Sequence, residues 1–260
     1  MKKTMYCVTL IAAVVSMFLI NVPVFASDTD DRIESAAMKS YVFKTYLKGD
    51  DVEVSSKDGA VTLTGTVNEE SHKSLAKETV ASLPGVKSVY NKLEVEDEAP
   101  AENSDAWLIT KVKTTLLFHR NVSATGTEVN AKDGNITLLG EADSEAQKDL
   151  TTEYAADVEG VKKVNNKMTV KTAKAKPAGT TIGQKMDSVI ESVDDASITA
   201  LVKTTLLYHR STSGLDTTVN TKDGVVTLGG KAGNKAEKDL AAKLVSDVHG
   251  VKKVINNMTV

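Results

Sequence analysis

Residues 57–65 read KDGAVTLTG and decide the fold of this chain. The stretch recurs as KDGNITLLG at 132–140 and as KDGVVTLGG at 222–230. Apolar and polar residues alternate on both sides of the Asp-Gly pair. Because a type I′ turn needs positive φ at both central residues, Asp-Gly between alternating runs predicts a tight β-hairpin. The predicted turn residues are Asp58, Gly59, Asp133, Gly134, Asp223 and Gly224.

Other positions repeat at the same spacings as the hairpin, 75 (132 − 57) and 90 (222 − 132). They are Gly65, Gly140 and Gly230, the Gly-Val pairs at 85, 160 and 250, and Asn91, Asn166 and Asn256. Repetition of this kind predicts three tandem domains: unit 1 at 31–96, unit 2 at 105–170 and unit 3 at 195–260. Units 2 and 3 are identical at 36 of 66 positions, and unit 1 is more divergent.

Each unit predicts the order helix, strand, strand, helix, strand. The first helix carries a row of apolar residues, seen at Leu108, Val112 and Leu116. The second helix is expected to begin at the N-caps Asn68, Asp143 and Gly233 and to end at the recurring glycine. One continuous last strand follows. The fold class is therefore α+β, with three small αββαβ domains, each a three-stranded sheet with two helices on one face.

The segments between the units are polar and contain Pro100 and Pro177, so they predict flexible or semi-extended joints. Loosely joined units would add little stability to one another. After the second joint, residues 182–193 show an apolar stripe at helical spacing, which predicts an accessory amphipathic helix. This helix either packs on unit 3 or docks a partner.

Residues 1–26 have a basic start, an apolar run from Val8 to Ile20 and an exit of small residues. This pattern is typical of a secretory signal peptide, with cleavage expected after Ala26. The alternative is an uncleaved membrane anchor, but the apolar run is shorter than the roughly 20 residues of a spanning helix. Cys7 is the one cysteine of the chain, so the exported protein would contain no thiol.

The composition, with 41% hydrophobic and 26% charged residues, is that of a soluble globular protein. The net charge is −3, and removing Lys2 and Lys3 with the leader makes it −5. An acidic chain offers little neutralisation of phosphates, so no nucleic-acid partner is expected.

An enzyme needs convergent nucleophiles, bases or metal ligands, and the four histidines are scattered along the sequence. We therefore predict no catalytic site, no metal site and no cofactor. Two histidines recur, within the pairs His119-Arg120 and His209-Arg210 at the predicted end of the first helix. These four residues are candidates for an anion site; alternatively, they only oppose the negative end of the helix dipole.

Three motifs together resemble the BON domain, a family found in OsmY-like bacterial proteins. They are Asp-Ala-x-Ile/Leu in the first helix, K-D-G-x-V/I-T-L-x-G in the hairpin and G-V-K-K-V-x-N-x-M in the last strand. The resemblance covers all three units and implies two helices on a small mixed sheet. It also implies a non-enzymatic periplasmic protein of the osmotic or envelope-stress response that acts as a chaperone or binds phospholipid.

The first helix is the surface implicated in lipid-binding members of that family. In unit 2 this implies Trp107, Thr110, Lys111, Lys113 and Leu117 as lipid-binding candidates, because tryptophan suits a water–membrane boundary. Alternatively, Trp107 only covers the local core. We favour chaperone-like binding of unfolded outer-membrane polypeptides as the function. Binding of an anionic phospholipid surface through this helix is the alternative.

Overall fold

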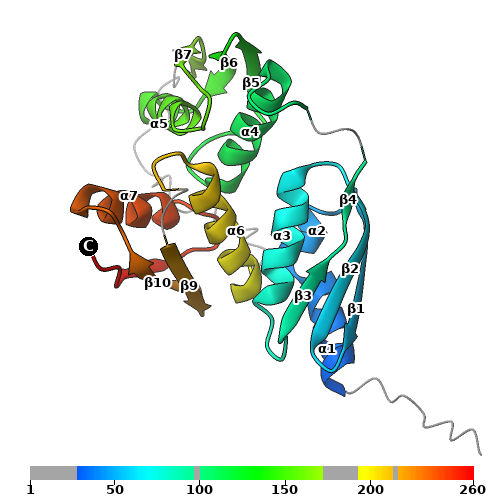
Figure 1. The fold of residues 1–260 in the computed structure, drawn as a ribbon. Coiled ribbons are helices and arrows are strands. Elements are labelled where there is room, and N and C mark those ends of the chain that lie inside the picture. Colours follow the sequence, from blue (N-terminus) through cyan, green and yellow to red (C-terminus); the bar gives the residue numbers. More distant parts are fainter. Residues whose placement is uncertain (1–27, 97–99, 172–192, 213–215) are drawn as a thin grey trace, which may run out of the picture.

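The computed structural model describes residues 28–96, 100–171, 193–212 and 216–260. The predicted signal peptide with its cleavage after Ala26, and all of the predicted accessory helix except Val193, lie outside the described residues. Figure 1 shows three separate small sheets along the chain, each with its own helices.

The three units repeat one order of elements. Unit 1 contains α1 (Asp28–Lys39), α2 (Tyr41–Thr45), β1 (Asp51–Lys57), β2 (Ala60–Val67), α3 (Glu70–Ala81), β3 (Ser88–Asn91) and β4 (Glu94–Val95). Unit 2 contains α4 (Asp105–Phe118), β5 (Thr127–Lys132), β6 (Asn135–Ala142), α5 (Glu145–Ala156), β7 (Lys163–Asn166) and β8 (Thr169–Val170). Unit 3 contains α6 (Asp195–Tyr208), β9 (Asp216–Lys222), β10 (Val225–Lys231), α7 (Lys235–Ser246) and β11 (Lys253–Asn256).

Each sheet is mixed, as the family resemblance implied. The middle strand pairs antiparallel with the strand before it and parallel with the strand that follows the second helix, giving the orders β1-β2-β3, β5-β6-β7 and β9-β10-β11. The α+β fold class is therefore confirmed. In units 1 and 2, however, β4 pairs with β2 and β8 with β6, so these sheets have four strands and not the predicted three. α1 begins at Asp28, three residues before the boundary that the repeat predicted for unit 1.

The hairpin turns have positive φ at both central residues, 55° and 80° at Asp58 and Gly59, and the other two turns repeat this geometry. A carboxylate in the first turn of the first helix holds each turn. Asp30 accepts the N–H groups of Asp58 and Gly59 at 2.8 and 2.9 Å. Asp105 and Asp195 do the same in units 2 and 3. The recurring Lys-Asp-Gly motif is thus part of a structural latch.

The recurring glycine at the end of the motif is required by the close approach of the two hairpin strands. A Cβ at Gly65 or Gly230 would lie only 1.9 or 1.8 Å from a carbonyl oxygen of the neighbouring strand, and a Cβ at Gly140 only 2.1 Å from the carbonyl oxygen of Gly126, just before β5. All three glycines have φ between 99° and 121°, which side-chain-bearing residues rarely adopt. Only glycine lets the hairpin strands approach so closely.

The recurring asparagine joins the last strand to the second helix. Asn166 donates from Nδ2 to the carbonyl of Lys148 in α5 and accepts the N–H of Met168 at Oδ1, both at 2.9 Å. Asn91 and Asn256 make the same two bonds. Because the asparagine accepts the backbone N–H of the residue two positions further on, the predicted continuous last strand is wrong. β3 and β7 end at the asparagine, and β4 and β8 begin after it.

The N-caps of the second helix lie one residue beyond the predicted positions. They are Glu69, Ser144 and Asn234. Ser144 and Asn234 accept an N–H from the first turn, whereas Glu69 makes no side-chain cap. The predicted caps Asn68, Asp143 and Gly233 are therefore wrong by one position.

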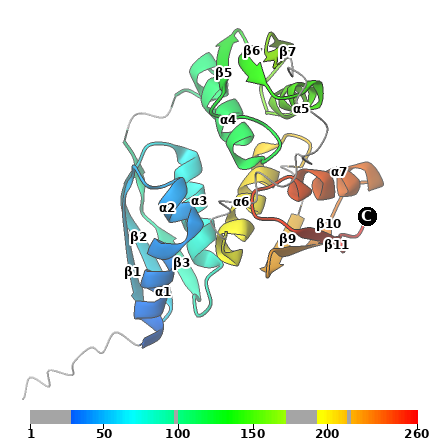
Figure 2. The same ribbon diagram turned by 180° about the vertical axis from the view of Figure 1, so that it is seen from behind.

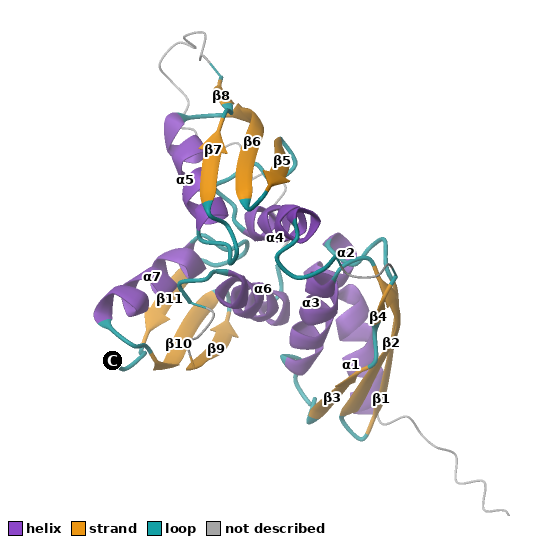
Figure 3. Cartoon of the chain, turned by 45° about the horizontal axis from the view of Figure 1, so that its top comes forward, coloured by secondary structure: helices purple, strands orange, loops and turns teal. Residues whose placement is uncertain are grey.

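The units pack against one another. In Figures 1 and 2, α6 lies between α3 of unit 1 and α7 of its own unit, and Figure 3 shows α3, α4 and α6 meeting near the centre. Hydrogen bonds cross from unit 1 to unit 3: Tyr41 N–H donates to Asp194 at 2.7 Å and Val42 N–H to Ser197 at 3.0 Å. One hydrophobic cluster contains side chains of both units. These contacts contradict the expectation that loosely joined units support one another little.

Candidate functional site

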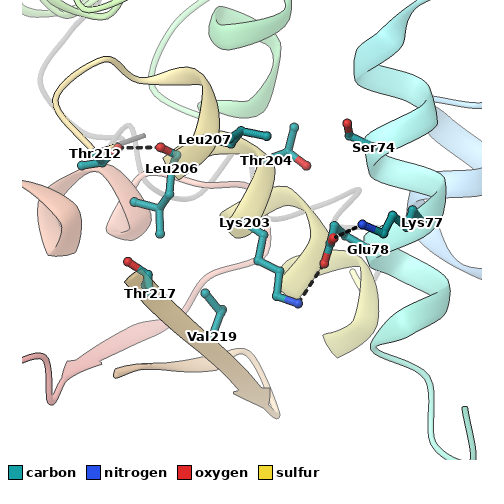
Figure 4. Close-up of a pocket in the computed structure, with 10 residues that line it drawn as sticks. All are labelled: Ser74, Lys77, Glu78, Lys203, Thr204, Leu206, Leu207, Thr212, Thr217 and Val219. Carbon is teal, nitrogen blue, oxygen red and sulfur yellow. Dashed lines mark hydrogen bonds and ion pairs between the residues drawn. The ribbon is translucent and has the colours of Figure 1, made fainter. Parts of the chain in front are cut away.

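A groove lies between the first helix and the edge strand of unit 3. α3 of unit 1 forms its opposite wall (Figure 4). The cavity measures about 380 Å³ and is lined by Ser74, Lys77, Glu78, Lys203, Thr204, Leu206, Leu207, Thr212, Thr217 and Val219. Lys203 and Glu78 form an ion pair of 2.8 Å across it. Leu206, Leu207 and Val219 form the apolar part of this lining, and Leu207 is 54% exposed.

Two hydroxyl groups in the lining of this groove have no hydrogen-bond partner among the described residues. They are Thr204 Oγ1 on α6 and Thr217 Oγ1 on β9, and both atoms are buried. A buried polar atom without a partner loses free energy, typically about 1–3 kcal/mol.

Unit 1 has a groove at the equivalent place, between α1 and β1. It is open, encloses about 600 Å³ and is lined by Asp31, Glu34, Ser35, Met38, Val52, Glu53, Val54, Ser55 and Thr64. Met38 is 51% exposed, and Val52 and Val54 are half-buried. Three carboxylates surround this apolar floor, so the groove favours an apolar ligand with basic groups.

The backbone of both edge strands is free to pair further. Lys57 and Ala60 flank the two-residue turn, and hydrogen-bonded pairs alternate from there along an antiparallel ladder. Val52 and Val54 therefore direct their N–H and C=O groups away from β2. Ser56 belongs to the same row, and its N–H reaches outward to Glu34 at 2.7 Å. By the same alternation, Thr217 and Val219 of β9 face outward.

The equivalent place in unit 2 is more closed. Thr127 and Val129 on β5 correspond to Thr217 and Val219 but are only 6% and 3% exposed. Lys113, an exposed lysine, stands at the position of Met38. The open grooves of units 1 and 3 are therefore not repeated at the equivalent residues of unit 2.

The lipid-binding candidates lie along α4, and most of them contact other parts of the protein. Trp107 is half-buried and packs on the core of unit 2, as the alternative interpretation proposed. The Lys111 ammonium lies 4.4 Å from the centre of its ring and 4.6 Å from that of Tyr208 in unit 3. Burial lowers the pKa of Lys111, against the opposing effect of Glu159 and Glu102. Leu117 packs against the cluster that units 1 and 3 share, Thr110 is half-buried, and Lys113 is exposed.

The anion-site candidates form the junction between units 2 and 3. His119 and His209 are fully buried, and their Nε2 atoms lie 3.0 Å apart. The fold thus brings together two histidines that the sequence left 90 residues apart. Each faces a carboxylate of the other unit: His119 Nδ1 lies 3.4 Å from Asp247, and His209 Nδ1 lies 3.0 Å from Asp157.

The arginines of the two pairs bind backbone across the same junction. Arg120 donates to the carbonyls of Val251 and Ser246 at 2.9 and 2.7 Å, and Arg210 to that of Ala156 at 3.1 Å. In place of an external anion, the four residues meet carboxylates and carbonyls of the neighbouring unit. Asp157 and Asp247 were not predicted from the sequence, although they recur at the 90-residue spacing while unit 1 has Ser82 there.

Within the described residues, no group of three or more His, Cys, Asp or Glu side chains could hold a metal ion. None of the helices in the described ranges is long and apolar enough to cross a membrane.

Comparison with known proteins finds a matching family and several similar proteins. The BON domain family matches residues 29–97, 104–172 and 194–260. Osmotically-inducible protein Y of Escherichia coli is 32% identical over 154 residues, which are 59% of this chain and 71% of that protein. Outer membrane lipoprotein DolP of Haemophilus influenzae is 30% identical over 135 residues, 51% of this chain and 68% of that protein. The C-terminal domain of CdsD, a structural protein of the type III secretion system of Chlamydia trachomatis, covers 89% of this chain and 96% of its own at 17% identity, with a TM-score of 0.22.

Proposed function

This chain belongs to the BON domain family, and on that premise we propose that it is a non-enzymatic, exported protein of the osmotic or envelope-stress response. Its activity is to bind extended, unfolded outer-membrane polypeptides in the periplasm along the edge strands of units 1 and 3. The names of two relatives, an osmotically inducible protein and an outer-membrane lipoprotein, support the stress and envelope parts of this proposal.

The pairing of an open edge strand with an apolar groove carries the proposal. An added strand would gain main-chain hydrogen bonds from the outward N–H and C=O groups, while its alternate side chains would enter the groove. Val52 and Val54 of β1 and Val219 of β9 supply the half-buried apolar surface.

Two grooves on one chain explain how weak contacts would hold a client. A second contact within one complex acts at an effective concentration of about millimolar, so two weak edges together bind far more tightly than one. Because the client is recognised mainly through its backbone, this mode requires no particular client sequence. That property suits a protein that protects varied unfolded chains.

A holdase assay with an unfolded outer-membrane β-barrel protein tests this function. We expect the wild type to suppress aggregation and the double variant Met38→Glu/Leu207→Glu to lose most of this effect, because both side chains are about half exposed beside the grooves. The matched control is Lys113→Glu, which places the same charge at the position of Met38 in unit 2 and should retain holdase activity. Unchanged aggregation with the wild type excludes the proposal.

Phospholipid binding through α4 is the second candidate. It is favoured by half-buried Trp107 beside Lys111 and exposed Lys113 on one helix. Co-sedimentation with anionic vesicles separates the two candidates: lipid binding predicts a sedimenting wild type and a weakened Trp107→Ala variant. Absence of the wild type from the vesicle pellet removes this candidate.

A further inference from the structure

The charged side chains that line the groove of unit 1 are all carboxylates. Asp31 and Glu34 lie on α1, and Glu53 lies on β1. Asp51 and Glu53 are exposed on the face of β1 that points away from the helices, because alternate residues of a strand face opposite sides. Among the described residues, none of these four carboxylates has an ion-pair partner. The edge of unit 1 therefore carries negative charge on both of its sides.

This arrangement of charge distinguishes unit 1 from unit 3. At the three lining positions that are acidic in unit 1, unit 3 has Ala196, Thr199 and Thr218. Its own groove contains Lys203 at the position of Met38, and this lysine is paired with a glutamate of unit 1. The two open edges therefore offer different electrostatic surroundings to a bound strand.

The open part of the β1 edge is short. Val52 and Val54 each direct one N–H and one C=O away from β2. The next outward-facing residue, Ser56, is already engaged: its N–H donates to Glu34 at 2.7 Å and its hydroxyl donates to Asp30 at 2.6 Å. An added strand can therefore pair with the edge only as far as the residue before Ser56.

Pairing with this edge would sort the side chains of an added strand into two rows. Residues directly opposite each other in neighbouring strands project to the same face of a sheet. Those opposite Val52 and Val54 would enter the groove, where Met38 and the two valines form an apolar surface. Those opposite Asp51 and Glu53 would lie on the outer face beside two carboxylates. Opposite charges at such cross-strand positions stabilise the pairing, and like charges destabilise it.

A second copy of this chain fits the same edge poorly. If β1 paired with β1 of another copy, Asp51 and Glu53 would lie close to the same carboxylates of the partner strand, and like charges would repel. Charged residues on an edge strand commonly prevent pairing between identical chains. A basic strand is in the opposite situation, because the same carboxylates attract it.

We propose that the edge of unit 1 selects extended segments in which apolar residues alternate with lysine or arginine. The apolar side chains enter the groove, and the basic side chains lie over Asp51 and Glu53. This inference rests on the proposed binding at the open edges and adds a side-chain preference to it. Backbone pairing alone sets no sequence requirement, so unit 3 accepts a broader range of segments.

The expected preference is modest because the contacts are exposed ion pairs. One such pair should change the affinity by about two- to fivefold, and two pairs by about five- to 20-fold. Salt gives the preference a second signature. Raising the ionic strength from about 0.1 to 1 M shortens the Debye length from about 10 to 3 Å, so the preference should shrink.

Hydrogen exchange of the full chain in the presence of three peptides tests the proposal. The peptides are blocked at both ends and consist of repeated Arg-Val, Ser-Val or Glu-Val pairs. Affinity is measured from the protection of the Val54 amide on β1, so binding at unit 3 does not contribute. We expect the arginine peptide to bind about five- to 20-fold more tightly than the serine peptide, and the glutamate peptide to bind most weakly.

Two variants separate the local carboxylates from the net charge of the chain. Asp51→Asn/Glu53→Gln should bind the arginine and serine peptides with nearly equal affinity while still binding the serine peptide as the wild type does. The matched control, Glu128→Gln/Glu141→Gln, removes the same number of charges from exposed sheet positions of unit 2 and should keep the preference.

Four results overturn the inference. Equal affinity of the arginine and serine peptides for the wild type removes the charge preference and leaves edge binding intact. A preference that persists in Asp51→Asn/Glu53→Gln assigns it to other residues. Protection of Val54 that grows with protein concentration in the absence of peptide shows that a second copy occupies the edge. Failure of all three peptides to protect Val54 removes edge binding at unit 1 itself.

Discussion

Replacing Leu201 by alanine measures how strongly packing against unit 3 stabilises unit 1. Leu201 is fully buried within the cluster that the two units share. Its equivalent in unit 2, 90 residues earlier, is the half-buried Lys111, so the leucine marks the face of α6 that unit 1 covers. Replacing a buried leucine by alanine typically costs about 2–5 kcal/mol. At 1.4 kcal/mol per factor of ten, that is a roughly 30- to 4,000-fold change in an opening equilibrium.

The assay is hydrogen exchange of the α3 amides, which belong to unit 1 although the substitution is in unit 3. We expect Leu201→Ala to accelerate their exchange by at least tenfold. Leu138→Ala is the control, because Leu138 is equally buried but lies in the separate core of unit 2. If α3 exchanges within twofold of the wild type in Leu201→Ala, unit 1 does not depend on unit 3 and the packing argument is refuted.

Three further substitutions test individual contacts of the fold. Gly230→Ala would force a Cβ against the Asp216 carbonyl at φ 99° and should destabilise unit 3 by about 1–3 kcal/mol in urea unfolding. A variant as stable as the wild type would contradict the close approach of the two hairpin strands. Asp195→Asn removes the charged acceptor of two turn N–H groups and should cost about 1–2 kcal/mol, whereas Asp239→Asn in an exposed ion pair should cost under about 1 kcal/mol. Asp157→Asn should cost about 1–3 kcal/mol at pH 7. Because the pKa of Asp157 is lowered, its contribution is present above the usual carboxyl pKa and fades as the pH falls through the folded value; a cost that is equal at pH 7 and pH 2 would contradict this.

Local motifs made most of each unit predictable. The Asp-Gly turn, the strand alternation and the recurring glycine all act through backbone geometry within a few residues, and such effects are visible in sequence. The bond of Asn166 to the second helix was not predictable, because the Lys148 carbonyl lies next to it only when α5 packs beside β7. The cap of α5 was misplaced by one residue since Asp143 and Ser144 are both good N-cap residues.

Contacts between the units could not be predicted from the sequence. His119 and His209 were singled out, but nothing in a linear pattern shows that their imidazoles meet Asp247 and Asp157 of the opposite unit. The positions at which unit 1 differs from the other two units indicate these partners. The His-Arg pair and the aspartate are present together in units 2 and 3 and absent together from unit 1. The open grooves were equally hidden, since the burial of Val129 and the exposure of Val54 follow from packing and not from residue type.

The most direct test of edge-strand binding is the exchange footprint of an unfolded outer-membrane polypeptide on the full chain. We expect slowed exchange at the outward-facing amides of Val54 on β1 and Val219 on β9, and no change on β5 of unit 2. Protection confined to α4, or protection of β5 equal to that of β1 and β9, would contradict binding at the open edges.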